Sequence, residues 1–441
     1  MKKVDLILQP KGLVQTVDNK PTLETGKALI ILEGKIEDIT SLDEAKKKYD
    51  SKEIIYLNDH VLIPGLINTH NHMSMSLMRG IADDIPLMDW LNNHIWPTEM
   101  KFVGPKFVED GALLAIGEMF LTGTTTCSDM YFFPETTAKA LEKAGMRGQL
   151  VTPILDFPTT YAQDGDGYLE KAEIFAKKYS GNPLVNIGLG PHAPYTVGDE
   201  TFKKLVKLNE KMNLPIQIHL HETKGECDDS LKSFGVRPME RLNQLGLFSW
   251  KVQCVHMTQM NDEEIDLAIK KDLSVVHCPE SNMKLASGIC PVPKLLKKGI
   301  NVGIGTDGAA SNNDLNLLGE MKTAGLLGKV DTLDPTACNA EEIFHMATLG
   351  GAKVLGLQDR VGELAVGKMA DIVAIKEEGF IDSFPNFNFL SNLIYAQSSQ
   401  RVDSVWVSGK RVVKDGELVT LNKDELLERT KIWQEKLSQS S

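Results

Sequence analysis

The stretch LIPGLINTHNH, residues 62–72, is an apolar run that ends in two histidines placed two residues apart. Seven later runs have the same form: each is apolar and is followed by a segment with helical periodicity. They are GTTTCSDM (123–130), GQLVTPILD (148–156), LVNIGLGPHAP (184–194), PIQIHLHE (215–222), KVQCVHM (251–257), LSVVHCPE (273–280) and NVGIGTDG (301–308). Eight units of a strand followed by a helix predict an α/β fold, a (β/α)8 barrel of the TIM type.

Both ends of the chain follow another pattern, in which short β segments are separated by turns. VDLILQP (4–10) and VDSVWVSGKRVV (402–413) are examples, and a charged helix is expected from about Lys423. We therefore predict a small β-sandwich domain built from both termini. The expected boundaries are residues 1–60 and 361–441 for this domain and residues 61–360 for the barrel.

The composition is that of a globular protein. Of the 441 residues 42% are hydrophobic and 24% are charged, and the formal net charge is −12 at pH 7. Because no basic cluster is present to bind phosphates, we expect no nucleic-acid partner. The apolar stretches are too short for a membrane span or a signal peptide, so no membrane association is expected. The six cysteines lack CxxC spacing, which favours reduced thiols and a cytoplasmic protein.

Polar residues gather at the C-terminal ends of the predicted strands, where barrel enzymes build their active sites. A single histidine at a strand end usually has a structural role. Seven of the ten histidines lie at such ends, however, and this number favours a functional site. They are His70, His72, His192, His219, His221, His256 and His277.

A metal site is the first function that this pattern indicates. His70 and His72 face the same way because residues two apart on a strand share one face, although an HxH pair alone is a weak signal. His219 and Asp307 would add a third imidazole and a carboxylate from other strands. Such a ligand set with an open position for water suits one divalent ion. We favour zinc, while iron, nickel and manganese stay open.

Six motifs follow one another along the chain: IPGLINTHNH (63–72), IHLHE (218–222), VHM (255–257), HCPESNMKLASG (277–288), GTDGAASNND (305–314) and GELAVGKMADIV (362–373). Through these motifs the chain resembles members of the amidohydrolase superfamily, within it the chlorohydrolase and deaminase branch, over essentially its whole length. Two-metal members carry a modified lysine at the end of the fourth strand, where this chain has His192, so the resemblance implies one metal ion.

Three residues have expected catalytic roles at the metal, whose bound hydroxide would attack purine C6. Asp307 can serve as a ligand and as the first proton acceptor, and His256 would orient the attacking water. Glu222 lies three residues after His219, and this HxxE spacing resembles that of family deaminases whose glutamate protonates the heterocycle. A solvated loop carboxylate is the alternative for Glu222. His221 points to the other strand face, which predicts a structural role.

The segment RGIADDIPLMDWL…IWPTEM, residues 79–100, resembles the methylthioadenosine/S-adenosylhomocysteine deaminases. This resemblance implies that Glu99 binds the ribose hydroxyls, that His192 reaches purine N3 and that Trp90 lines the pocket. A carboxylate can accept from both hydroxyls of a diol, and an imidazole N–H can donate to a ring nitrogen. A surface acid for Glu99 and a core aromatic for Trp90 are the structural alternatives.

The substrate preference is inferred from missing arginines. Relatives that take S-adenosylhomocysteine well place two arginines in the third barrel unit and its loop, where this chain has Pro153 and Tyr168. Without such a clamp the amino-acid carboxylate would be weakly held. We therefore expect hydrolytic deamination of 5′-methylthioadenosine to 5′-methylthioinosine and ammonia. Adenosine is expected as a further substrate, and S-adenosylhomocysteine stays open.

Two other readings compete with this one. The same metal and glutamate would serve an aminohydrolase of a free base or heterocycle, such as guanine, a pterin or an s-triazine. A catalytically inactive scaffold is the reading from another class, and it is disfavoured because the whole predicted ligand set is present. The resemblance also implies a homo-oligomer.

Overall fold

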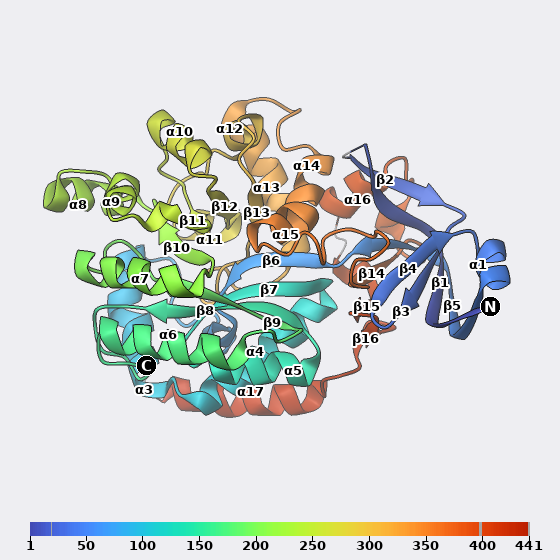
Figure 1. The fold of residues 1–441 in the computed structure, drawn as a ribbon, viewed down its shortest axis with the longest axis horizontal. Coiled ribbons are helices and arrows are strands. Elements are labelled where there is room, and N and C mark those ends of the chain that lie inside the picture. The colour runs from blue at the N-terminus through green and yellow to red at the C-terminus, as the bar shows by residue number, and fades with distance from the viewer. Residues whose placement is uncertain (19, 397–398, 440–441) are drawn as a thin grey trace.

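Eight parallel strands form the barrel, and neighbouring strands follow each other in the sequence (Figure 1). The structure, a computed structural model, describes residues 1–18, 20–396 and 399–439. The barrel strands are β6 (Leu66–Asn71), β7 (Thr124–Met130), β8 (Arg147–Ile154), β9 (Val185–Pro191), β10 (Ile216–Leu220), β11 (Val252–His256), β12 (Ser274–His277) and β13 (Val302–Ile304). The predicted TIM-type barrel is confirmed.

The barrel closes where the segment after β13 meets β6. The main-chain N–H of Asp307 donates to the carbonyl of His70 at 3.0 Å. The side-chain oxygen of Asn68 accepts from the main-chain N–H of Thr306 at 3.1 Å. The residues that close the barrel are therefore those of the predicted ligand strands themselves.

A second, mixed sheet of nine strands combines strands from the N-terminal and C-terminal parts of the chain and lies beside the barrel (Figure 1). At its centre β5 pairs in parallel with β1 and antiparallel with β14, which joins the two ends of the chain. The predicted small β domain from both termini is confirmed, and its strands share one hydrogen-bonded sheet. They are β1 (Lys2–Val17), β2 (Lys20–Thr25), β3 (Ala28–Leu32), β4 (Lys35–Thr40), β5 (Tyr49–Pro64), β14 (Ile372–Lys376), β15 (Val402–Val407), β16 (Lys410–Lys414) and β17 (Glu417–Leu418).

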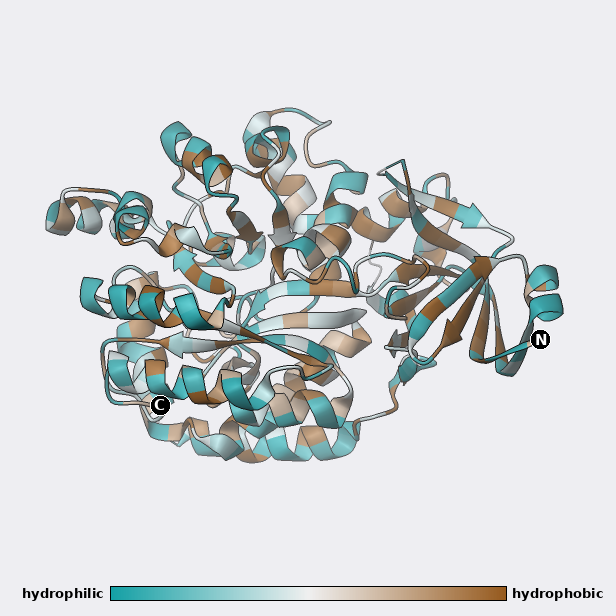
Figure 2. Ribbon diagram, viewed as in Figure 1, coloured by the Kyte–Doolittle hydropathy of each residue, from teal (hydrophilic) through white to brown (hydrophobic). Residues whose placement is uncertain are grey.

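Helices surround the barrel strands, and several of them are amphipathic, with hydrophobic and hydrophilic residues in stripes along them (Figure 2). In α7, for example, Phe202 and Leu205 are buried while Lys203 and Lys207 are exposed, which is the spacing of one helical face. These helices are α4 (Pro105–Leu121), α5 (Pro134–Ala144), α6 (Gly165–Tyr179), α7 (Asp199–Met212), α8 (Lys224–Phe234), α9 (Pro238–Gln244), α10 (Asp262–Lys270), α11 (Pro279–Lys284), α12 (Val292–Lys297), α13 (Leu317–Thr332), α14 (Ala340–His345) and α15 (Gly351–Val354).

Shorter helical elements complete the chain. The long excursion after β6 contains a π-helical turn, η2, between two short α-helices. These elements are α1 (Leu42–Lys48), η1 (Met73–Met78), α2 (Leu87–Trp90), η2 (Leu91–Ile95), α3 (Trp96–Phe102), η3 (Leu247–Ser249), η4 (Met346–Gly350), η5 (Ile381–Ser383), α16 (Phe389–Tyr395), η6 (Ser399–Arg401) and α17 (Lys423–Ser438). Among the helices in the described part of the chain, none is both long and apolar enough to span a membrane. All six cysteines are free and buried.

Polar contacts at two places tie the parts of the molecule together. Arg147, at the start of β8, is completely buried, and its Nε lies 3.2 Å from Asp371 Oδ2 just before β14. The last helix, α17, runs back along α4 (Figure 1), where Trp433 Nε1 donates to Asp110 Oδ2 at 2.9 Å. Arg429 of α17 also lies 2.8 Å from Asp110 Oδ1. The barrel is thus joined to the C-terminal segment at both places.

Candidate active site

A cavity of about 360 Å³ opens at the C-terminal ends of the barrel strands. Its walls come from these strand ends and from residues 87–100, which run across α2, η2 and α3. Of the nine predicted site residues, His70 lies beneath the cavity floor, completely buried. The other eight line the cavity: His72, Trp90, Glu99, His192, His219, Glu222, His256 and Asp307.

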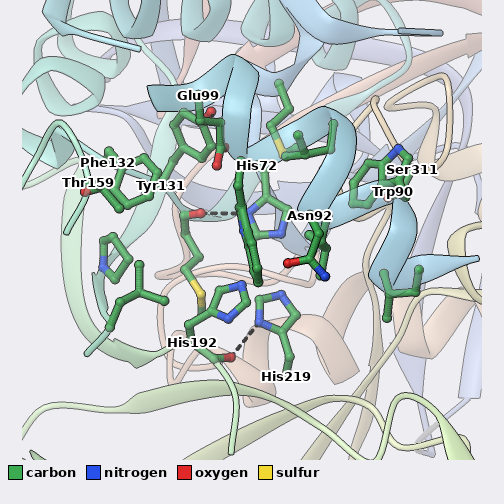
Figure 3. Close-up of a pocket in the computed structure, with 18 of the residues that line it drawn as sticks. His72, Trp90, Asn92, Glu99, Tyr131, Phe132, Thr159, His192, His219 and Ser311 are labelled. Carbon is green, nitrogen blue, oxygen red and sulfur yellow. Dashed lines mark hydrogen bonds between the residues drawn. The ribbon is translucent and has the colours of Figure 1, made fainter. Parts of the chain in front are cut away.

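Three histidines gather at the floor of the cavity. The nearest ring nitrogens of His70, His72 and His219 all lie within 4.8 Å of one another. The Nε2 atoms of His70 and His219 are only 3.2 Å apart. Figure 3 shows His72 and His219 close together at one end of the pocket, with Glu99 on the far side of His72. Strands β6 and β10, with the residue that directly follows β6, thus supply a compact group of three imidazoles.

The outer nitrogen of each of these three rings is held by an oxygen acceptor. His70 Nδ1 lies 2.7 Å from Gln217 Oε1, His72 Nδ1 lies 2.6 Å from the Met130 carbonyl and His219 Nδ1 lies 2.7 Å from the His192 carbonyl. A carbonyl only accepts hydrogen bonds, so Nδ1 carries the proton in each neutral ring. The unprotonated Nε2 atoms therefore converge, which is how proteins present imidazoles to a metal ion.

Asp307 supplies the negative charge at the same point. Its Oδ1 lies 3.5 Å from His70 Nε2 and 3.2 Å from His72 Nε2. Burial raises the pKa of Asp307, but the hydrogen bonds from His70 and His72 outweigh it and hold the pKa well below its usual range. Burial lowers the pKa of His72, but the hydrogen bond and charge of Asp307 raise it to about 9. Asp307 therefore favours a positive charge at this point, either a proton on a histidine Nε2 or a divalent metal ion that takes its place, and three nitrogens with one carboxylate fit such an ion.

Two hydroxyls fix the other oxygen of Asp307. The Oδ2 atom accepts from Ser281 Oγ at 2.7 Å and from Ser311 Oγ at 3.1 Å. Asp307 has a positive φ of 60°, as do His256 at 76° and His221 at 54°. Non-glycine residues in this left-handed region are strained, and such strain is concentrated at functional sites.

Glu222 and His256 lie side by side at the metal-site end of the cavity. His256 Nε2 is 3.8 Å from Glu222 Oε2, and its Nδ1 lies 2.8 Å from Asn282 Oδ1. Burial, reinforced by the negative charge of Asp307, raises the pKa of Glu222 to about 8. Glu222 is therefore largely protonated at neutral pH and can donate a proton.

The sugar-binding and base-binding candidates line other walls of the same cavity. Glu99, in the first turn of α3, accepts a hydrogen bond from Tyr131 at 2.7 Å. His192 follows β9, and its Nδ1 lies 3.1 Å from Thr196 Oγ1. Burial, with the neighbouring histidines, lowers the pKa of His192 to about 3, so its ring is neutral. Trp90 is buried in the wall with 6% of its surface exposed.

The two positions at which related enzymes were expected to carry arginines have different surroundings. Pro153, on β8, lines the cavity. Tyr168 is completely buried, and its hydroxyl is hydrogen-bonded to Thr159 Oγ1 behind the cavity wall. Among the described residues that line the cavity, none is lysine or arginine.

His221, predicted to be structural, lies outside the histidine group. Its side chain is buried against Cys227, Arg237 and Glu264, at 3.2–3.3 Å. The sequence analysis did not identify Gln217, Tyr131 or the two serines, Ser281 and Ser311, whose hydroxyls donate to Asp307. Gln217 could have been found, because it lies two residues before His219 on β10 and so shares its face.

Comparison with known proteins agrees with this geometry. Residues 61–412 match the amidohydrolase family. A protein of Saccharophagus degradans named 5-methylthioadenosine/S-adenosylhomocysteine deaminase is 46% identical over 438 residues, which cover 98% of this chain and 97% of the relative. A 5′-deoxyadenosine deaminase of Methanothermobacter thermautotrophicus is 40% identical, over 93% of this chain and 97% of the relative.

A solved structure is similar from end to end. The crystal structure of an adenosine deaminase from Xanthomonas campestris with bound zinc has a TM-score of 0.96 and 38% sequence identity, with 99% of both chains covered. The family match spans most of this chain, and the relatives match nearly its full length. The chain belongs to the amidohydrolase family.

Proposed function

We propose that this chain catalyses the hydrolytic deamination of 5′-methylthioadenosine to 5′-methylthioinosine and ammonia. One observation carries the proposal: a single cavity has Glu222 and three convergent imidazoles at one end, two of them in its lining and His70 beneath its floor, and Glu99 away from them. The imidazoles and Glu222 suit hydrolysis of a C–N bond, and the Glu99 carboxylate suits binding of the ribose diol. The relatives named above are deaminases of adenine nucleosides, which supports this substrate class.

In this proposal His70, His72, His219 and Asp307 bind one divalent ion, which we take to be zinc. The ion, when bound, would lower the pKa of a water molecule so that hydroxide is available near neutral pH. Zinc suits three imidazole nitrogens and one carboxylate oxygen with a further position left open. The zinc in the similar Xanthomonas campestris structure supports this choice.

Three side chains of the chain would handle the protons. His256, held at Nδ1 by Asn282, would orient the attacking water. Asp307 would accept the first proton, because its low pKa keeps it ionised before the reaction. Glu222 would donate to the ring nitrogen of the purine, since its raised pKa keeps it protonated.

The rest of the cavity would recognise the nucleoside. Glu99 would accept from both ribose hydroxyls, and Trp90 would form an apolar wall beside the base. His192 would donate from Nε2 to purine N3, which requires Thr196 Oγ1, 3.1 Å from His192 Nδ1, to turn its proton from the Ala193 carbonyl to that nitrogen. The proton on Nε2 is then set by a hydroxyl outside the cavity.

The preference for methylthioadenosine rests on charge. S-adenosylhomocysteine carries a carboxylate, and the described lining offers no lysine or arginine to pair with it. The carboxyl groups of Glu99, Glu222 and Asp307 in the lining likewise offer that carboxylate no positive partner. A methylthio group has no charge to satisfy and suits apolar neighbours such as Trp96 and Phe157, whose rings are 5.4 Å apart.

A coupled ammonia-release assay tests the proposal. Purified protein would be screened with methylthioadenosine, adenosine, S-adenosylhomocysteine, guanine and a pterin. We expect the highest kcat/KM with methylthioadenosine, then adenosine. Release of ammonia from guanine or the pterin but from no nucleoside would overturn the substrate class. A higher kcat/KM with S-adenosylhomocysteine would overturn only the preference.

We also propose a homo-oligomer in the cytoplasm. The six free, buried cysteines support a reducing compartment. The resemblance described above supports self-association. Sedimentation of the purified protein would decide between monomer and oligomer.

A further inference from the structure

Glu99 is held by a residue from a different part of the fold. Tyr131 directly follows β7 of the barrel, whereas Glu99 belongs to α3 in the excursion after β6. The Tyr131 hydroxyl lies 2.7 Å from Glu99 Oε1, and only 4% of Tyr131 is exposed. Burial and the negative charge of Glu99 raise the pKa of this phenol well above its usual range, so it remains a donor.

Helix α3 continues directly from η2, whose Leu91 and Ile95 are buried, so the backbone of α3 is anchored at its start. None of its seven residues, all of them described, is fully buried. Trp96 at its start packs on Phe157 from the opposite wall, at 5.4 Å between ring centres. A carboxylate on a short, shallow helix would otherwise sample several rotamers, and ordering it on binding would weaken affinity.

The hydrogen bond leaves Glu99 free to act on a ligand. Among the described residues, Tyr131 is the hydrogen-bond donor found for this carboxylate, and it occupies Oε1. A carboxylate has about four lone-pair sites, so one bond leaves room for two hydroxyl donors. The carboxylate also has no lysine or arginine beside it in the described lining of the cavity, so no fixed cation competes with a ligand for it.

We infer that Tyr131 is a positioning residue for the sugar end of the substrate, whose hydroxyl fixes the Glu99 carboxylate so that it accepts from the 2′ and 3′ hydroxyls. This inference rests on the proposed function, because it takes Glu99 as the ribose-binding residue. Tyr131 itself makes its effect through Glu99. Loss of the Tyr131 hydroxyl therefore weakens the binding of substrates that carry a diol and leaves the binding of substrates without a diol unchanged.

The test compares Tyr131→Phe with the wild-type protein on adenosine and 2′,3′-dideoxyadenosine. These substrates differ only in the two hydroxyls. We expect Tyr131→Phe to raise KM for adenosine roughly tenfold, the size of one hydrogen bond to a charged group, and to leave dideoxyadenosine within about twofold. Because the ratio of the two substrates is measured on one preparation, any misfolded fraction cancels.

Tyr161→Phe is the matched control. Tyr161 lies in the same aromatic cluster, with its ring 6.4 Å from that of Phe132, and it does not line the cavity. This variant also loses a tyrosine hydroxyl, but not the one that is bonded to Glu99. The ratio of adenosine to dideoxyadenosine activity should therefore stay at the wild-type value. In a Glu99→Ala background, Tyr131→Phe should have no further effect on adenosine.

The possible failures are distinguishable. If wild-type protein deaminates neither nucleoside, or if Glu99→Ala leaves the ratio unchanged, the proposed function of Glu99 is wrong. If Glu99→Ala collapses the ratio while Tyr131→Phe keeps the wild-type ratio, the positioning role of Tyr131 alone is wrong. Equal losses on both substrates in Tyr131→Phe would also refute it, because they indicate a general structural role.

Discussion

The main-chain N–H of Asp307 donates to the main-chain carbonyl of His70 at 3.0 Å, so the first and last strands of the barrel meet at two predicted ligands. A metal ion held by both side chains would cross-link the seam. Chelation should therefore lower the Tm and raise amide exchange in β6 and β13 more than in β8 and β9. Mass spectrometry of exchange checks this, and a uniform rise along the barrel would contradict it.

The histidine group should hold one equivalent of metal per chain. Replacing His70, His72 or His219 by alanine removes one converging nitrogen, and metal content measured by mass spectrometry should fall to a small fraction. His94→Ala is the control, since His94 is exposed and does not line the cavity. Retention of a full equivalent by the His219 variant would exclude this residue as a ligand.

Activity should fall in alkali because of Glu222. Burial and the charge of Asp307 raise its pKa to about 8. A group that acts as the proton donor works below its pKa, so kcat/KM should decline as the pH rises through about 8. Glu222→Gln should lower kcat roughly 10²–10⁴-fold with metal retained. If the residual activity of the Gln variant keeps the same alkaline decline, another group is responsible.

Thr196 should matter only for substrates that have N3. Thr196→Val removes the hydroxyl 3.1 Å from His192 Nδ1 and should lower kcat/KM for adenosine roughly tenfold, the loss expected for one hydrogen bond. Thr196→Ser should behave as wild type. With 3-deazaadenosine, which lacks this nitrogen, Thr196→Val and the wild-type protein should have the same kcat/KM. A loss of equal size on the deaza analogue would show that the threonine serves the loop instead.

Substrate preference should respond to a charge at position 153. Pro153 lines the cavity, so Pro153→Arg should raise the ratio of kcat/KM for S-adenosylhomocysteine over methylthioadenosine at least several-fold, through a charge-assisted hydrogen bond. Pro153→Leu, which removes the proline without adding charge, should leave the ratio unchanged. An equal kcat/KM ratio in the two variants would show that the amino-acid end of S-adenosylhomocysteine does not lie beside position 153.

The buried pair Arg147–Asp371 should govern stability and not catalysis. Asp371→Ala leaves a fully buried guanidinium without its partner, which costs about 3–5 kcal/mol of unfolding free energy. Denaturant unfolding measures the loss, and kcat/KM of the folded fraction should be unchanged. The double variant Arg147→Met/Asp371→Leu should recover part of the stability. No recovery would mean that the other hydrogen bonds of Arg147 dominate.

The barrel was predictable because its signal is local and repeated. Each strand is a short apolar run with a polar end, and strand ends of a barrel converge whatever the loops do. The contacts that orient the site carry no such signal. Tyr131 contacts Glu99 only because the excursion after β6 turns back over β7. Ser281, which follows β12, contacts Asp307, which follows the neighbouring strand β13. Pairings of this kind depend on loop paths, which periodicity does not encode.

The acceptors that orient His72 and His219 are main-chain carbonyls, those of Met130 and His192. Every amino acid presents the same carbonyl at these places, so exchanging either side chain leaves the orientation of the ligands intact. Residue 192 thus has two separable roles: its main-chain carbonyl orients His219 at the metal site, and its ring would bind the substrate. A lineage can therefore explore new substrates at this wall of the cavity without passing through variants that have lost the metal.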